Sequence, residues 1–173
     1  MDLESAPPQY FCVLSKLLQG DLVSATSILD ENPELVYMVA GRESLLHFCV
    51  IENAIEAVEF LLKRGANVEQ RREEDDETPL LDAVILESSE MLALLLEHGA
   101  NPNVSSGGMG WALEYAIEDG NFDAVLLLLS HGADVKRVTD FDSLIAQHFS
   151  EDQQKTVLSI LTVSGSASPN TCD

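Results

Sequence analysis

The stretch that decides the fold runs from Thr78 to Asn101 and reads TPLLDAVILESSEMLALLLEHGAN. Thr78 can cap a helix, and Pro79 suits the first turn of that helix. Further along, Met91 and the leucines that follow it give a second helix a broad apolar face. Gly99 then ends the second helix, because a residue without a Cβ fits a left-handed C-terminal cap. The stretch therefore predicts two short helices and a stop.

The same pattern recurs on both sides of this stretch. Each copy closes with Leu-Leu-x-x-Gly-Ala followed by Asn or Asp, and the glycines are Gly65, Gly99 and Gly132. These glycines lie 34 and then 33 residues apart. The openings at Ser44, Thr78 and Trp111 each precede their glycine by 21 residues, so both parts of the pattern keep one register. Neither helix of a copy can bury its apolar face alone, so stacked neighbours must supply the core.

The repeat resembles a known family. The period, the opening Thr78-Pro79-Leu80 with Ala83 after it, and the Leu-Leu-x-x-Gly-Ala-Asn/Asp close are similar to the ankyrin repeat over about residues 10 to 160. The resemblance implies an all-α solenoid of stacked helix pairs with projecting loops or β-hairpin fingers. In such proteins the fingers and the first helices of the pairs usually form a concave binding surface.

Five repeat units are predicted along the chain. Three clear repeats occupy residues 41–73, 74–106 and 107–139, and degenerate capping repeats occupy about residues 10–40 and 140–163. Terminal repeats are expected to be atypical because one side of each must face water. Residues 1–9 are predicted to be an N-terminal tail, and the Ser-, Pro- and Asn-containing residues 164–173 a disordered tail.

Charge restricts the partners that this chain can bind. Its 173 residues include 30 acidic and 9 basic residues, which give a formal net charge of −21 at neutral pH. Such a charge repels nucleic acid and anionic membrane surfaces and favours cationic partners. We therefore expect a partner protein with a basic surface, no direct nucleic acid or membrane binding, and a monomer when no partner is bound.

The cysteines and the N-terminus bear on the compartment. Three cysteines are an odd number without paired metal-ligand spacing, which indicates a reducing environment. The N-terminus carries acid where a secretory signal would carry positive charge, and no apolar run approaches the roughly 20 residues of a membrane span. We expect a cytoplasmic protein, or a nuclear one if the organism is a eukaryote.

Catalytic and metal-binding motifs are missing from the sequence. The four histidines are spread along the chain, and His98 and His131 both precede the repeat glycine, where the C-terminal end of a helix favours them. His47 is predicted to have a structural hydrogen-bonding role, and Cys49 to be packed. No zinc-binding, phosphate-cradling or nucleophile-elbow pattern occurs. We expect no enzymatic activity, no cofactor and no metal.

An acidic run is the sharpest local feature. It comprises Glu73, Glu74, Asp75, Asp76 and Glu77, on the finger between the first two clear repeats. A charge run alone usually indicates a solvated loop. The resemblance also places this run where such proteins often touch a ligand, so contact with a basic patch is the alternative.

A second set of candidates lies near the ends of the first helices, on the side expected to be concave. These residues are Ile51, Glu52, Ile85, Leu86, Glu118 and Asp119, and Glu43 is assigned to the same acidic surface. Ile85 and Leu86 are apolar where solvent is expected. They either pack under a neighbouring finger or form the centre of an interface with an acidic rim.

Two aromatic residues complete the candidate site. Trp111, the single tryptophan, replaces the capping threonine beside Met109, in a glycine-rich finger. Tryptophan is enriched at binding hot spots, and it is also often buried by its own repeat. Phe141, between two aspartates in the last finger, presents the same alternatives.

Two functions from different classes remain. The first is a stoichiometric binding module that presents an acidic concave face with an aliphatic centre to a basic partner, as an adaptor or an inhibitor. Its more specific form is an immunity-type antagonist that occupies the basic groove of a toxin or nucleic-acid-processing enzyme. The second is a constitutive structural or assembly subunit whose acidity serves solubility only.

Overall fold

The computed structural model describes residues 6–72, 76–107 and 110–164. In these ranges the chain repeats a pair of antiparallel helices. The first helices are α1 (Pro8–Leu18), α3 (Leu45–Ile51), α5 (Pro79–Ile85), α7 (Ala112–Glu118) and α9 (Phe141–His148). The second helices are α2 (Leu22–Glu31), α4 (Ile55–Lys63), α6 (Ser89–Glu97), α8 (Phe122–Ser130) and α10 (Glu151–Ser164).

Short elements lie in the connections between the pairs. Two-residue strands β1 (Val39–Ala40) and β2 (Glu43–Ser44) pair antiparallel, as do β3 (Ser105–Ser106) and β4 (Gly110–Trp111). The 3-10 helices η2 (Pro33–Tyr37) and η3 (Val135–Arg137) lie in the first and last connections.

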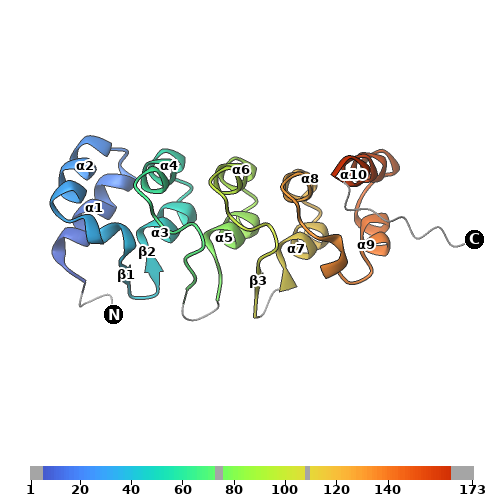
Figure 1. Cartoon of the computed structure of the whole chain (residues 1–173), viewed down its shortest axis with the longest axis horizontal. Coiled ribbons are helices and arrows are strands. Elements are labelled where there is room, and N and C mark those ends of the chain that lie inside the picture. The colour runs from blue at the N-terminus through green and yellow to red at the C-terminus, as the bar shows by residue number, and fades with distance from the viewer. Residues whose placement is uncertain (1–5, 73–75, 108–109, 165–173) are drawn as a thin grey trace, which may run out of the picture.

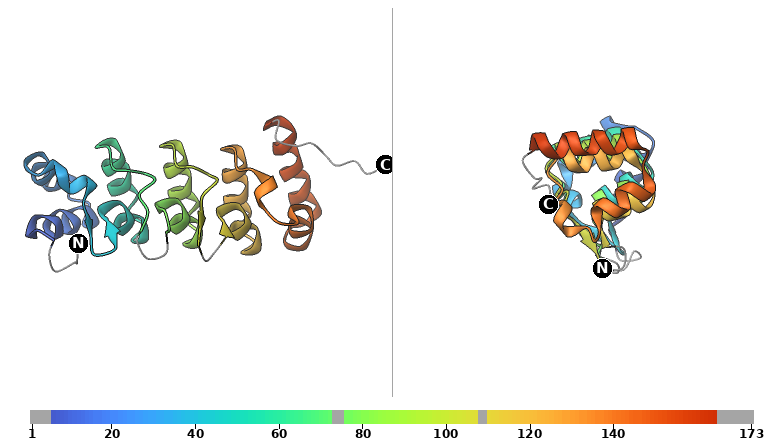
Figure 2. Two further views of the ribbon diagram at one scale, coloured as in Figure 1. Left: turned by 60° about the horizontal axis from the view of Figure 1, so that its bottom comes forward. Right: turned by 90° about the vertical axis from the view of Figure 1, so that its right-hand side faces the viewer.

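The helix pairs stack side by side in a row (Figure 1). The second helices form one layer, the first helices form the layer beneath it, and the fingers project below the first helices. A view along the row shows the pairs superimposed (Figure 2). The predicted all-α solenoid with projecting fingers is confirmed.

Local sequence explains where the helices begin and end. The hydroxyls of Ser44 and Thr78 accept hydrogen bonds from the backbone N–H groups of His47 and Leu81 at 3.3 and 3.4 Å, so both residues cap their helices, as predicted for Thr78. Trp111 begins α7 without a side-chain cap. The repeat glycines follow the second helices with φ between 87° and 91°, a left-handed conformation that glycine adopts without steric cost.

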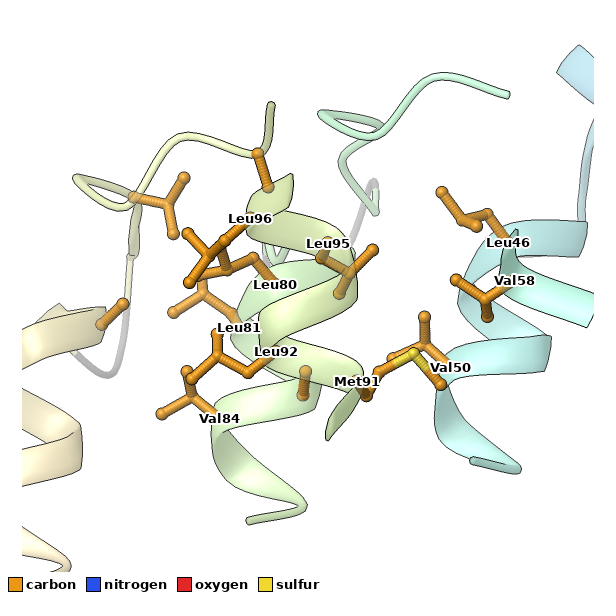
Figure 3. Packing of buried hydrophobic residues seen from close by; sticks show 14 of the residues in the cluster. Leu46, Val50, Val58, Leu80, Leu81, Val84, Met91, Leu92, Leu95 and Leu96 are labelled. Carbon is orange, nitrogen blue, oxygen red and sulfur yellow. The ribbon is translucent and has the colours of Figure 1, made fainter. Parts of the chain in front are cut away.

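One continuous core runs through the stack. The leucines at the opening and at the close of the three clear repeats are all buried in it: Leu46, Leu61, Leu62, Leu80, Leu95, Leu96, Leu113, Leu128 and Leu129. Figure 3 shows how neighbouring repeats share this core, with the Met91 side chain of α6 reaching toward Val50 of α3. Full burial of a side chain of this size contributes about 1.5–3 kcal/mol.

Polar contacts between repeats fix the connections. The backbone N–H of Asn101 donates to Oε1 of Glu69 at 2.7 Å, and the N–H of Asp134 donates to Oδ1 of Asn103 at 2.7 Å. The Asn103 side-chain amide also donates to the carbonyl oxygen of Gly132 at 3.1 Å. Each connection is thereby bound to the one before it, which sets the spacing of the repeats.

The ends of the helical region differ slightly from the prediction. Pro7 caps α1 and α1 begins at Pro8, so residues 7–9 belong to the first helix and its cap and not to a tail. At the other end α10 extends to Ser164, which was predicted to be the first residue of the disordered tail, and residues 165–173 of that tail lie outside the described residues. Within the described ranges no helix is both long and apolar enough to cross a membrane.

Candidate functional site

The first helices of the repeats have two ends, and these form two long edges of the stack. The finger edge consists of the connections before the first helices, residues 38–44, 66–77, 100–111 and 133–140. The turn edge consists of the segments where the first helix of each of the three clear repeats turns into its second helix, residues 51–56, 85–90 and 117–123. The predicted site residues divide between these two edges.

Arg72 is the centre of an ion cluster on the finger edge. Its guanidinium contacts the carboxylates of Glu43 at 3.4 Å and Asp82 at 2.8 Å, and it also pairs with Glu77. The Arg72 and Asp82 side chains are only 12% and 5% exposed. The backbone N–H of Arg72 also donates to the carbonyl oxygen of Glu77 at 3.0 Å, which closes the finger. Water is largely excluded from this cluster, so its ion pairs are screened weakly.

This cluster corrects the prediction for Glu77. We expected Glu77 to project to solvent with the acidic run, but its side chain is buried against Arg72. Glu43 is half-buried at the same guanidinium, and its backbone carbonyl accepts a hydrogen bond from the Tyr10 hydroxyl at 3.1 Å. Both carboxylates are therefore already engaged within the protein.

The rest of the acidic run is only partly described. Asp76 is exposed with φ of 60°, and its carboxylate accepts a hydrogen bond from Arg71 at 2.7 Å. The same guanidinium donates to the carbonyl oxygen of Ser105 on the next finger at 3.3 Å. Glu73, Glu74 and Asp75 lie outside the described residues.

The two aromatic candidates that the structure describes, Trp111 and Phe141, are both half-buried, and Phe141 lies in α9 and not in the last finger. The Arg137 guanidinium lies over the Trp111 ring, 4.6 Å from its centroid, and the ring is half-buried. Phe141, the first residue of α9, is half-buried against the core. Met109 lies outside the described residues. A partner that contacted the covered face of Trp111 would have to displace Arg137.

The turn edge has a different charge pattern. Its carboxylates are all exposed: Glu52, Glu56, Glu87, Glu90, Glu118, Asp119 and Asp123. Residues 51–56, 85–90 and 117–123 contain no lysine or arginine, whereas five of the nine basic residues lie on the finger edge. Because these turns follow one another along the stack, the turn edge forms a band of negatively charged side chains.

A hollow of about 470 Å³ interrupts this band between the turns of the first two clear repeats. It is lined by Ile51 and Asn53 from one turn and by residues 86–90 from the next. Leu86 is 46% exposed and Ile51 is 36% exposed, while Ile85 is half-buried. Of the two alternatives left open for Leu86, the structure has the exposed one. Sequence reasoning did not pair Leu86 with Ile51, because Ile51 occupies the register position of Ile85 and not that of Leu86.

The backbone of these turns has left-handed residues. Asn53 and Glu87 have φ of 51° and 53°, at the positions where other turns have Gly20 and Gly120. The N–H of Glu87 donates to Val84 and that of Ser88 to Ala83, which is the hydrogen-bond pattern of a Schellman cap. The Ser88 hydroxyl donates to Oδ1 of Asn53 at 2.7 Å and joins the two sides of the hollow.

The histidines and Cys49 occupy structural positions. Nδ1 of His47 lies 2.9 Å from the Ser44 hydroxyl, and Nδ1 of His98 and of His131 lies 2.9 Å from the carbonyl oxygen four residues earlier. Cys49 is buried, which raises the pKa of its thiol to about 12. Among the described residues no group of three or more His, Cys, Asp and Glu side chains could hold a metal ion.

Comparison with known proteins identifies the fold family. A family model described as ankyrin repeats, in three copies, matches residues 17–106 and 46–139, which together cover more than half of the chain. The chain belongs to the ankyrin-repeat family. Ankyrin repeats are a module for protein–protein interaction and are generally not catalytic.

Relatives of known name share parts of the chain. The fowlpox virus ankyrin repeat protein FPV031 is 35% identical over 62% of this chain and 32% of its own length. The mouse B-cell lymphoma 3 protein homolog is 38% identical over 51% of this chain and 20% of its own. Mouse palmitoyltransferase ZDHHC13 is 38% identical over 50% of this chain, but that match covers only 15% of the enzyme. The chain therefore spans a third or less of these relatives.

A solved structure supports the same fold. The ankyrin repeat domain of Bcl-3, described as a unique member of the IkappaB protein family, aligns with a TM-score of 0.57 and 30% sequence identity. The alignment covers 70% of this chain and 52% of the Bcl-3 chain.

Proposed function

We propose that this ankyrin-repeat chain binds a partner protein with a basic surface, as an adaptor or a stoichiometric inhibitor, and that the turn edge makes the contact. The observation that carries this proposal is the row of seven exposed carboxylates in three turns that contain no cation. Such a row accelerates association with a positively charged surface and makes binding sensitive to salt. The chain itself supplies no catalytic chemistry in this proposal, and it acts in the cytoplasm or nucleus.

An immunity-type antagonist is the narrower form of this proposal. A row of carboxylates presents regularly spaced negative charge, as a phosphate backbone does, so it fits the basic groove of a toxin or nucleic-acid-processing enzyme. The second candidate is a constitutive assembly subunit, and it is favoured by the exposed aliphatic residues Leu86 and Ile51. A fixed subunit contact of that kind would depend on apolar area and little on salt.

Charge reversal on the turn edge tests the proposal. The triple variant Glu87→Lys, Glu118→Lys and Asp119→Lys is compared with the wild type in affinity capture from the host lysate at about 50 and about 300 mM salt. A matched control triple, Glu31→Lys, Glu34→Lys and Glu97→Lys, makes the same change of net charge at exposed positions away from the turn edge.

The outcomes separate the candidates. We expect the wild type to lose its partner at the higher salt concentration, and the turn-edge triple to lose it at both. Equal losses in the two triples would mean that only overall charge matters and that the turn edge is not the contact site. Capture that is indifferent to salt and to both triples would support the constitutive subunit.

A further inference from the structure

We infer that the hollow between the turns of the first two clear repeats receives one bulky aliphatic side chain from a partner segment in which lysine or arginine flanks that residue. This inference rests on the proposed function, and it adds the chemistry of the occupant. It concerns the pocket lined by Ile51, Asn53 and residues 86–90.

The walls of the hollow favour an aliphatic occupant. Ile51 and Leu86 come from neighbouring repeats and are both partly open to solvent, whereas the corresponding positions of the third clear repeat are Glu118 and Asp119. The apolar pair is therefore local to one point on the turn edge. Burying an aliphatic side chain between these two residues removes apolar surface of both proteins from water.

The rim of the hollow favours cations beside that aliphatic residue. Glu87 and Glu90 belong to the lining itself, and Glu52 is exposed next to Ile51. Neither turn contains a basic residue, so these carboxylates have no cation from their own segments. A partner that inserts an apolar side chain without flanking positive charge would bring uncompensated carboxylates close to its own surface, which is unfavourable.

The hollow has a defined shape. The Ser88 hydroxyl donates to Oδ1 of Asn53 across the two turns, and the helices before both turns, α3 and α5, end in the backbone hydrogen bonds of a Schellman cap. A recess whose backbone is already fixed loses little backbone conformational entropy when it is filled. An aliphatic anchor with basic neighbours thus satisfies both the walls and the rim.

The test uses two synthetic peptides and the full chain. One peptide has a leucine between two pairs of arginines, and the matched peptide has serine in place of that leucine. Dissociation constants and backbone amide chemical shifts are measured for both at low salt. We expect about tenfold tighter binding of the leucine peptide, since burial of one aliphatic side chain supplies about that factor. The largest shift changes should fall on residues 51–53 and 86–90.

Two matched variants assign any preference to the hollow. Leu86→Asn removes one wall, whereas Leu158→Asn makes the same change at a residue of α10 that is 55% exposed and lies in another repeat. We expect the leucine preference to disappear in Leu86→Asn and to persist in Leu158→Asn. Both variants should keep the helical circular dichroism of the wild type, because both side chains are exposed.

Each other result has one meaning. If both peptides bind the wild type equally, in a salt-dependent way, the anchor site is wrong while the acidic turn edge stands. If the leucine preference survives in Leu86→Asn, or the shift changes lie on the finger edge, the anchor is elsewhere and the inference fails. If neither peptide binds at low salt, recognition of a basic partner and the anchor site both fail.

Discussion

The carboxylates on the two edges of this stack have different neighbours. On the finger edge three of the carboxylates lie beside arginines, with Glu43 and Glu77 at Arg72 and Asp76 at Arg71. On the turn edge the carboxylates are exposed and their segments contain no lysine or arginine. A cation from another protein would compete with internal arginines on the finger edge, whereas on the turn edge it would meet no such competitor.

This difference shows that a dense run of acidic residues in the sequence does not by itself indicate a binding surface. The run from Glu73 to Glu77 is the densest acid in the sequence, yet its described members are bound by arginines of the same finger. The turn edge contains no such run, because its carboxylates come from three segments about 33 residues apart. Stacking of the repeats turns those separate residues into one surface.

The largest effect is expected at Arg72. Arg72→Met should lower the free energy of unfolding by about 3–5 kcal/mol, because the carboxylates that surround the guanidinium would remain clustered without their cation. Arg71→Met is the matched control. Its side chain is 40% exposed and pairs with the more exposed Asp76, so its loss should cost about 0–1 kcal/mol.

Urea unfolding followed by circular dichroism measures both variants. Losses of equal size would show that the Arg72 cluster is no better shielded from water than an ordinary surface pair. The comparison of the two edges would then lose its basis, since the finger-edge carboxylates would be as available to a partner as those of the turn edge.

Most of the fold could be predicted from the sequence, because the repeat encodes it locally. Thr78, Pro79 and Gly99 specify a helix start and a stop within one repeat, and the buried leucines follow from helical periodicity. The burial of the Glu77 side chain against Arg72 could not be predicted in this way. It depends on Arg72 reaching Glu43 and Asp82, 29 and 10 residues away, which local patterns do not reveal.

The candidate site was predicted in part for the same reason. The register placed Leu86, Glu118 and Asp119 at the ends of first helices, where the structure has them exposed. It did not indicate that Ile51 and Leu86 line one hollow, because that depends on the geometry between neighbouring repeats. One sequence signal was missed. Glu87 occupies the position at which two other turns have Gly20 and Gly120, and glycine at that position indicates a left-handed backbone conformation.

A smaller effect is expected at Glu87, and it separates stability from binding. Glu87→Gly should raise the free energy of unfolding by up to about 1 kcal/mol, because glycine adopts positive φ without the steric cost that glutamate has. The same variant should weaken capture of a basic partner, since it removes a carboxylate from the rim of the hollow. Retaining glutamate here would then favour function over stability.

Glu87→Gln is the control for this variant. It keeps the strained backbone and removes only the charge, so it should weaken capture as Glu87→Gly does while leaving the urea midpoint near that of the wild type. If neither variant changes capture, Glu87 is not part of the contact surface, and the turn edge would have to act through its other carboxylates.

The smallest effect is expected at Asp21, in the turn between α1 and α2. This first turn of the stack differs from the turn edge because a basic residue, Lys16, lies beside its carboxylate. Asp21 caps α2 through a hydrogen bond from the backbone N–H of Ser24 at 3.1 Å, and its carboxylate pairs with Lys16 at 3.1 Å. Hydrogen bonding from Ser24, together with Lys16, lowers the pKa of Asp21 to about 2 from an ordinary value of 3.8.

A lowered pKa gives this carboxylate a stabilising effect with a definite pH dependence. Because the folded state holds the ionised form more strongly than the unfolded state, the contribution is complete above about pH 4 and is lost as the pH falls toward about 2. Asp21→Asn keeps a capping side chain and removes the charge. The urea midpoint of the wild type should therefore exceed that of the variant near neutral pH, and the gap should narrow between about pH 4 and about pH 2.

A gap that stays constant over this range would mean that the cap acts as a neutral hydrogen-bond acceptor. Lys16 would then contribute nothing to it, and the first turn would resemble the turn edge in having an uncompensated carboxylate.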